Sequence, residues 1–176
     1  MIKRILTYYA ERLNEYLSRI HKQPEGMVEV GFVGNGAEMK PNKMLVSLIG
    51  IEREVTAGIS APIQRTGGGY TRMMPSLMLN LNIVLVAVYD EKQYAESLSV
   101  LSDTLKFVQS LPKFEVDDIG YTIEIVNLST QDVNNIWTTL GGQYYPSVIC
   151  KIRRLTIDAE EITSSGNLAV KPSVKL

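Results

Sequence analysis

The stretch Ser76–Tyr89, SLMLNLNIVLVAVY, places the strongest constraint on the fold. In a strand, successive side chains point to opposite faces. One face of this stretch is apolar throughout, and the other begins with Asn80 and Asn82 and then becomes valine-rich. A strand that is apolar on both faces must be covered on both sides. We therefore predict a strand inside a sheet, whose two asparagines face solvent or a partner subunit.

Two amphipathic stretches predict helices that cover such a sheet. Residues Ile2–Ile20 place their apolar side chains on one helical stripe, with the charged residues off it. Asp90 is expected to cap a second helix, which ends near Leu111-Pro112. The apolar stripe of this second helix, expected to pack on the sheet, is Tyr94, Leu98, Leu101, Leu105 and Val108.

Further strands are predicted on either side of these helices. Met27–Val33 and Lys43–Val55 alternate as strands, and the second is apolar on both faces at its centre. Lys113–Asp118 reads as a short connector or edge strand, followed by a strand at Thr122–Leu128. The element order is that of an α+β domain, with a mixed, mostly antiparallel sheet flanked by about three helices.

The third helix is predicted within Ser129–Ile157, STQDVNNIWTTLGGQYYPSVICKIRRLTI. Ser129 and Asp132 have the spacing of a reciprocal N-terminal cap. The apolar face of this helix is Val133, Ile136, Trp137 and Leu140, so Trp137 is expected to be a core residue. Gly141 is suited to the positive φ that ends many helices, and Gly142 allows a further turn.

A long strand is predicted after this helix. Tyr145 precedes Pro146, and the residue before proline is pushed into an extended conformation. The apolar positions change parity at Arg153-Arg154. This change predicts either a β-bulge or a strand with both faces partly covered.

Two segments are predicted to lie outside this framework. Thr56–Pro75 contains Gly67, Gly68 and Gly69, but it lacks the Lys-Ser/Thr of a phosphate-binding loop, so we expect an interaction loop or a mobile segment. Residues 163–176 are poor in large apolar side chains and are predicted to be an extended tail. Leu168 and Val170 could let this tail add as a strand to another chain. The predicted domain is therefore residues 1–162.

Composition excludes several classes of function. The charges nearly cancel, with 18 Lys and Arg against 19 Asp and Glu, which argues against general nucleic-acid binding. The single cysteine, Cys150, and the single histidine, His21, cannot make a usual zinc site, and neither is placed for nucleophilic catalysis. We predict no cofactor, no metal and no enzyme activity. The N-terminus is too charged for a signal peptide and no stretch could span a membrane, which favours a reducing cytoplasm.

Four pieces in the same order resemble one known family. They are LNEYL at Leu13–Leu17, Pro75–Tyr89, Tyr94–Gln109 and IWTTLGGQYYPSVICKIRRLTID at Ile136–Asp158. The sequence is similar to the tail terminator, or cap, proteins of phage-tail-like contractile injection systems of the antifeeding-prophage and virulence-cassette type. The residues that carry the motif are Trp137, Leu140, Gly141, Gly142, Tyr145, Pro146 and Ser147.

This resemblance implies a structural protein of a released or cell-anchored particle. Such a protein forms a homo-hexameric ring on the last tube and sheath layers, ends polymerisation and couples sheath to tube. The implied partners are the chain itself, the tube and the sheath, with no nucleic acid and no membrane insertion. The candidate interface residues are Arg65, Gly67, Gly68, Gly69, Tyr70, Arg72, Arg153, Arg154, Leu168 and Val170. The alternative function is a small non-enzymatic adaptor of a type VI-like or phage-derived assembly. The alternative interpretation of the four arginines is that they are solvated surface charges.

Overall fold

The computed structural model describes residues 1–23, 26–34, 42–54, 63–66, 69–73, 76–157 and 162–167; at 63–66, 69–73 and 162–167 the description is of the backbone. The chain divides into two compact units. The first is Met1–Glu52 with Asn80–Arg154, and the second is Arg53–Leu79 with Leu155–Leu176.

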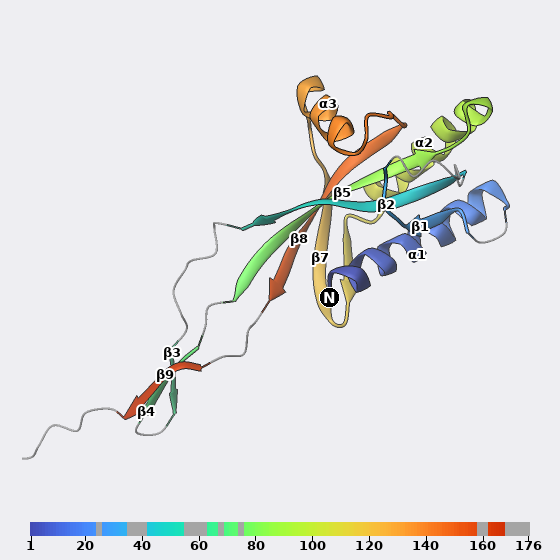
Figure 1. Cartoon of the computed structure of the whole chain (residues 1–176). Helices are drawn as coiled ribbons and strands as arrows, with labels where there is room; N and C mark the ends of the chain where they lie inside the picture. Colours follow the sequence, from blue (N-terminus) through green and yellow to red (C-terminus); the bar gives the residue numbers. More distant parts are fainter. Residues whose placement is uncertain are drawn as a thin grey trace, which may run out of the picture. The chain divides into compact units, whose positions relative to one another are not determined.

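A six-stranded sheet in the order β1-β2-β5-β8-β7-β6 is the framework of the fold (Figure 1). β1 runs parallel to β2, whereas β6–β7 and β7–β8 pair antiparallel. The predicted α+β class, with a mixed and mostly antiparallel sheet, is therefore confirmed. The strands are β1 (Val28–Val30), β2 (Lys43–Arg53), β5 (Leu77–Val88), β6 (Lys113–Val116), β7 (Ile119–Ile125) and β8 (Ser147–Ile157).

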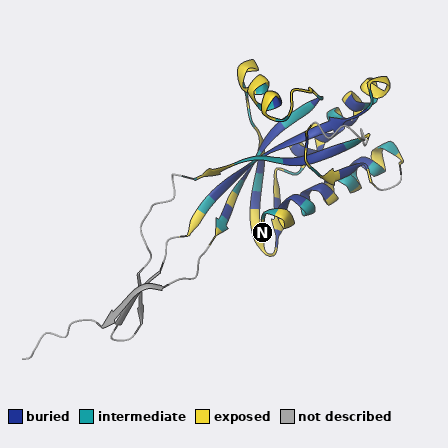
Figure 2. Ribbon diagram, viewed as in Figure 1, coloured by how far each residue is buried: buried dark blue, intermediate teal, exposed yellow. Residues whose placement is uncertain are grey.

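Three α-helices, within the described ranges, cover the two faces of this sheet (Figure 1). α1 (Ile2–His21) and α2 (Tyr94–Ser110) lie on one face, and α3 (Thr130–Thr139) lies on the other. A single 3-10 turn, η1 (Glu91–Gln93), precedes α2, and Asp90 caps it by accepting from the backbone N–H of Lys92. The middle of the sheet is buried on both faces (Figure 2).

The strand that most constrained the fold is interior, as predicted. β5 lies between β2 and β8 and, from Leu79 to its end, every residue except Asn82 is buried. The expectation that both asparagines face solvent or a partner is wrong for Asn80, which is 5% exposed. Asn82 is partly buried and donates to Glu52 Oε1 at 2.6 Å, so its amide is used inside the chain.

The predicted buried stripe of α2 is wrong. Tyr94, Leu98 and Leu105 are exposed, at 53%, 41% and 37%. The buried face of α2 instead contains Ser97, Val100, Asp103, Thr104, Phe107 and Val108, so only Val108 of the predicted stripe is buried. Two buried hydroxyls make this possible, because Ser97 Oγ donates to Tyr94 O at 2.7 Å and Thr104 Oγ1 donates to Val100 O at 2.8 Å.

The second unit contains a three-stranded antiparallel sheet in the order β3-β4-β9. Its strands are β3 (Ile63–Thr66), β4 (Gly69–Met73) and β9 (Ile162–Asn167). The expected loop between residues 56 and 75 is therefore wrong at β3 and β4. β9 pairs with β4 of the same chain. The domain boundary at residue 162 stays a prediction.

Candidate assembly surfaces

The third helix begins at a reciprocal cap, as the sequence predicted. Asp132 N–H donates to Ser129 Oγ at 3.2 Å, and Ser129 N–H donates to Asp132 Oδ2 at 3.2 Å. These bonds satisfy backbone donors that a helix start leaves without partners. The cap fixes where α3 begins and therefore which side chains it presents to the sheet.

Trp137 is the buried anchor of α3, and its prediction as a core residue is confirmed. It is 5% exposed and belongs to a cluster with Val84, Val86 and Ile149 of the sheet. The indole ring lies 5.4 Å from the ring of Tyr144, edge to face. Val133, Ile136 and Leu140 are partly buried around this cluster, as expected for the apolar face of the helix.

The two glycines after α3 adopt the conformation that their positions require. Gly141 has φ 111° and Gly142 has φ 80°. Gly142 N–H donates to Trp137 O at 2.7 Å, which closes the last turn of the helix. Pro146 is buried, and its carbonyl accepts from Ala87 N–H at 2.9 Å, so it connects this turn to β5.

Charged side chains of β8 form ion pairs within the first unit. Lys151 Nζ lies 2.7 Å from Glu52 Oε2, and this bond, followed by that from Asn82, holds the pKa of the Glu52 carboxyl below its usual value. Arg153 Nε donates to Glu124 Oε1 at 2.8 Å. Glu52 and Glu124 were missed in the sequence, because they lie 99 and 29 residues from their partners.

The strand β8 has its irregularity where the parity change predicted one. Arg154 has φ 77°, and Ile152 and Leu155, three residues apart, are both fully buried. A residue in the left-handed region occurs in one type of β-bulge. Arg154 is exposed, and it has no ion partner in the part of the chain that the structure describes.

Four of the predicted interface residues lie on the second sheet. Arg65 is on β3, and Gly69, Tyr70 and Arg72 are on β4, where Arg65 pairs in register with Tyr70. The predictions for Gly67, Gly68, Leu168 and Val170 lie outside the described residues. The structure therefore brings Arg65, Tyr70 and Arg72 into one sheet, whereas Arg153 and Arg154 belong to β8.

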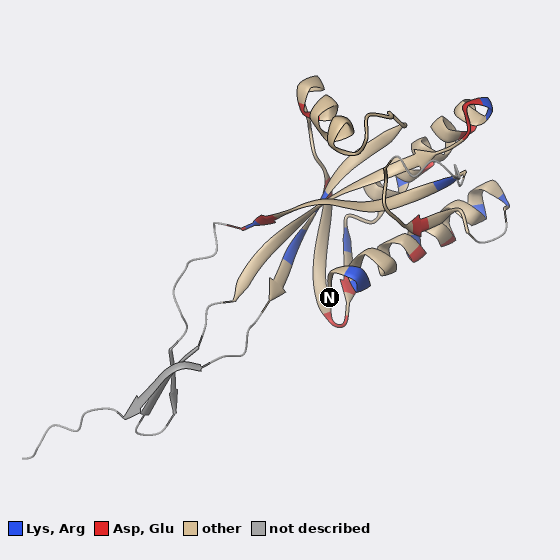
Figure 3. Ribbon diagram, viewed as in Figure 1, with Lys and Arg blue, Asp and Glu red and all other residues tan. Residues whose placement is uncertain are grey.

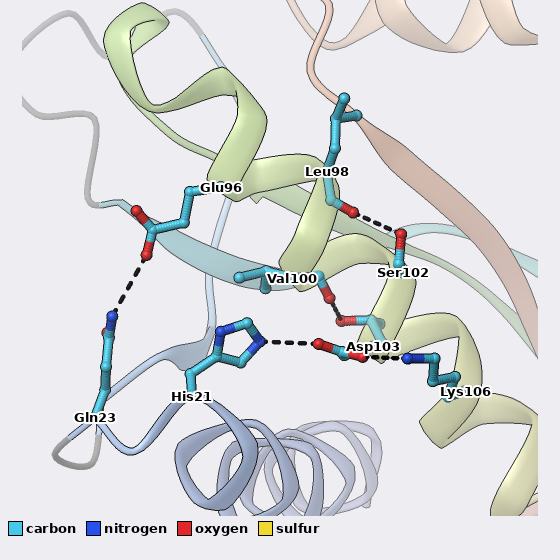
Figure 4. A network of polar contacts seen from close by, with 9 residues as sticks. His21, Gln23, Glu96, Leu98, Val100, Ser102, Asp103 and Lys106 are labelled. Atoms are coloured by element: carbon cyan, nitrogen blue, oxygen red, sulfur yellow. Dashed lines mark hydrogen bonds and ion pairs between the residues drawn. The ribbon is translucent and has the colours of Figure 1, made fainter.

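The single histidine connects two helices (Figure 4). His21 Nε2 lies 3.1 Å from Asp103 Oδ2, and Lys106 Nζ lies 2.8 Å from Asp103 Oδ1. The hydrogen bond from Lys106, ahead of the charge of His21, lowers the pKa of the Asp103 carboxyl. His21 thus contacts an acid on α2, and its position is that of a residue tying α1 to α2.

Cys150 is a buried residue of β8, with no exposed side-chain area. Burial raises the pKa of its thiol to about 12, so the nucleophilic thiolate is absent at neutral pH. Among the described residues no group of three or more His, Cys, Asp or Glu side chains could hold a metal ion. No helix in the described ranges is long and apolar enough to cross a membrane.

Two of the hollows in the described part of the first unit lie beside helices and combine apolar walls with a few polar groups. The larger, about 680 Å³, lies between the start of α1 and the β6–β7 turn and contains the Arg4–Asp117 ion pair at 2.7 Å. The smaller, about 300 Å³, lies between α3 and the sheet and is lined by Ile49, Ile136 and Asn82 among others.

Charges of both signs are spread over the described part of the chain rather than gathered on one face (Figure 3).

Charged side chains of the six-stranded sheet pair with one another, and a protein-family model matches most of the sequence. The model of the Pvc16 N-terminal domain matches residues 5–171. This chain belongs to the Pvc16 N-terminal domain family. The predicted family resemblance is therefore confirmed, whereas the motif role of Trp137, the two glycines and Tyr145-Pro146 stays a prediction. No curated protein matches the sequence of this Pvc16 N-terminal domain.

Two solved structures share the fold of this Pvc16 N-terminal domain. One is the PVC sheath/tube terminator of an extracellular contractile injection system in its extended state, with a TM-score of 0.61 and 11% identity over 94% of this chain. The other is the tube terminating cap of the anti-feeding prophage, with a TM-score of 0.54 and 14% identity over 96% of this chain. The present chain spans 61% and 59% of the length of those two chains.

Proposed function

We propose that this chain is the tail terminator, or cap, of a phage-tail-like contractile injection system. It ends polymerisation of the tail and couples the sheath to the tube, and it acts as a structural component rather than as an enzyme. Its partners are the tube protein and the sheath protein of the same particle. It is made in the cytoplasm, where it joins the growing particle.

The observation that carries this proposal is the family match over residues 5–171, together with a fold shared with the PVC terminator over 94% of this chain. The internal chemistry is compatible with a structural role. His21 and Cys150, whose residue types are often used in catalysis, lie against the Asp103 carboxyl and in the buried part of β8.

A homo-hexameric ring is part of the proposal. A closed ring uses heterologous contacts, in which different patches of each subunit meet. The exposed apolar side chains of Tyr94, Leu98 and Leu105 on α2 provide one such patch. Six copies of a 19.6 kDa chain would then close on the end of one tail.

The test is to assemble tube and sheath proteins with and without this chain and to measure particle lengths by electron microscopy. We expect a narrow length distribution and the chain at one end of each particle when it is present. Without it, tubes and sheaths of variable length are expected. Equal length distributions, with no chain at the ends, would contradict the terminator function and favour the adaptor.

A further inference from the structure

The strand register divides the second sheet into two faces of different chemistry. Residues that pair directly across strands share a face, as do alternate residues along one strand. The pairs Arg65–Tyr70, Ile63–Arg72, Tyr70–Gly166 and Arg72–Ser164 therefore define one face, Ile63, Arg65, Tyr70, Arg72, Ser164 and Gly166. The other face is Gln64, Thr66, Gly69, Thr71, Met73, Ile162, Ser165 and Asn167.

The first of these faces, called the arginine face below, has the composition of a binding surface. Both arginines of the three strands and Tyr70 lie on it, and no Asp or Glu occurs within β3, β4 or β9. The opposite face carries amides, hydroxyls and a glycine, with the apolar pair Met73–Ile162 at one end and no charge. Arginine and tyrosine are enriched among the residues that dominate binding energies.

We propose that the arginine face docks onto an acidic protein surface at the end of the tube. This inference rests on the proposed function and names the surface used and its partner. Two arginine positions on one face, with no acid within the same strands, favour a partner that presents carboxylates, because a carboxylate can accept bidentate hydrogen bonds from arginine. Nucleic acid is the weaker partner, because two cations do not make the clustered basic surface that phosphate backbones require.

A second copy of this chain is the less favoured occupant of the arginine face, because part of its acidic surface is neutralised by ion pairs within the chain. Several carboxylates of the first unit are already paired within it. These pairs are Glu29 with Lys43 at 2.8 Å, Glu52 with Lys151 at 2.7 Å, Asp117 with Arg4 at 2.7 Å and Glu124 with Arg153. The solved relatives point to the tube, because both are described as ending a tube and one of them also ends a sheath.

Arg153 has a role in the six-stranded sheet rather than in docking, although the sequence suggested the same role for all four arginines. It is bonded to Glu124 on the neighbouring strand, so its charge is used within the six-stranded sheet. Reversing its charge would remove that ion pair and would test the sheet rather than docking. The arginine face is therefore tested at Arg65 and Arg72.

The experiment measures binding of the purified chain to sheath-free tubes and, separately, to tubes carrying sheath. The test variant is Arg65→Glu with Arg72→Glu, and the matched control is Gln64→Glu with Thr71→Glu. The control adds the same kind of charge to the same two strands but on the opposite face. A second variant, Arg65→Gln with Arg72→Gln, removes charge without adding repulsion, and Trp137 fluorescence and circular dichroism report whether each variant is folded.

We expect the Glu variant to lose at least about tenfold in affinity for bare tubes, the Gln variant to lose less, and the control to bind as the wild type does. Wild-type binding should weaken with added salt. Equal binding by all folded variants, equal loss in the control, or a loss confined to sheathed tubes would overturn the inference. Wild-type chain that binds neither kind of tube would instead contradict the terminator function.

Discussion

Asp103 is the residue at which the packing of two helices depends on a charge. Its carboxyl contacts His21 from α1 and Lys106 from α2, and its side chain is only 12% exposed. The bond from Lys106 lowers its pKa, so the folded state binds a proton less readily than the unfolded chain. This contribution to stability is complete above the unfolded pKa of about 3.9 and is lost as the pH falls through the lowered folded value.

We therefore expect Asp103→Asn to lower the free energy of unfolding at pH 7 and to make stability fall less steeply in acid. Urea unfolding followed by circular dichroism at pH 7 and near pH 3 measures both effects. Glu115→Gln, at an exposed position of β6, is the control and should leave both curves unchanged. A constant difference between Asp103→Asn and wild type at both pH values would refute the electrostatic explanation.

Gly142 has a positive φ, which other residue types adopt only with backbone strain. Its φ is 80°, and a Cβ added there would meet nothing within 4 Å, so strain rather than collision sets the penalty. Gly142→Ala should cost about 1 kcal/mol of stability by urea unfolding. Gly120→Ala, also in open space but without positive φ, is the matched control and should be close to neutral. Equal effects of the two changes would argue against strain at the end of α3.

At the scale of elements, α2 is where the hydrophobic pattern alone misleads. It has two faces that could be buried, and the one facing the core contains Ser97 and Thr104, whose hydroxyls bond to the preceding turn of the same helix. By hydrophobic periodicity serine and threonine are polar residues, so the sequence pattern predicts that the leucine stripe of α2 faces the core. By contrast α1 and α3 have one apolar face each, and for them the sequence was sufficient.

Substitutions on the two faces of α2 should differ sharply. Leu98→Ser and Leu105→Ser should change stability by less than about 1 kcal/mol, because both side chains are exposed. Phe107→Ala should cost about 3–5 kcal/mol, because this ring is 5% exposed and packs 5.5 Å from the ring of Tyr9. Thermal or urea unfolding of the purified chains measures the contrast. A large loss of stability in either leucine variant would restore the stripe predicted from the sequence.

At the scale of the whole molecule, the core lies in the first unit and the arginine face in the second. Most of the buried side chains described for the first unit come from α1, α2, α3 and the six-stranded sheet. Replacing residues 63–73 by a Gly/Ser linker should therefore change the free energy of unfolding by less than about 1 kcal/mol. The same variant should lose binding to tubes in the assay for the arginine face. A variant that fails to unfold cooperatively would mean that β3 and β4 contribute to the core.

The sequence was most informative where local rules decide. The cap at Ser129, the glycines after α3, the burial of Trp137 and the irregularity at Arg154 follow from spacing and backbone preference. It was least informative where partners are distant in the chain. The Lys151–Glu52 pair and the pairing of β4 with β9 join segments about 90 to 100 residues apart, which no local pattern encodes. The candidate interface was therefore seen as separate arginines rather than as one face.

The strand order also bears on when this chain can become native during synthesis. β8, among the last strands to be made, lies between β5 and β7 in the six-stranded sheet. Until it emerges from the ribosome, β1-β2-β5 and β7-β6 have no strand to join them, and such non-local pairing is slow to form. A nascent or truncated chain that lacks β8 therefore cannot complete its sheet. A chain still being translated would therefore not occupy the binding site of a complete chain.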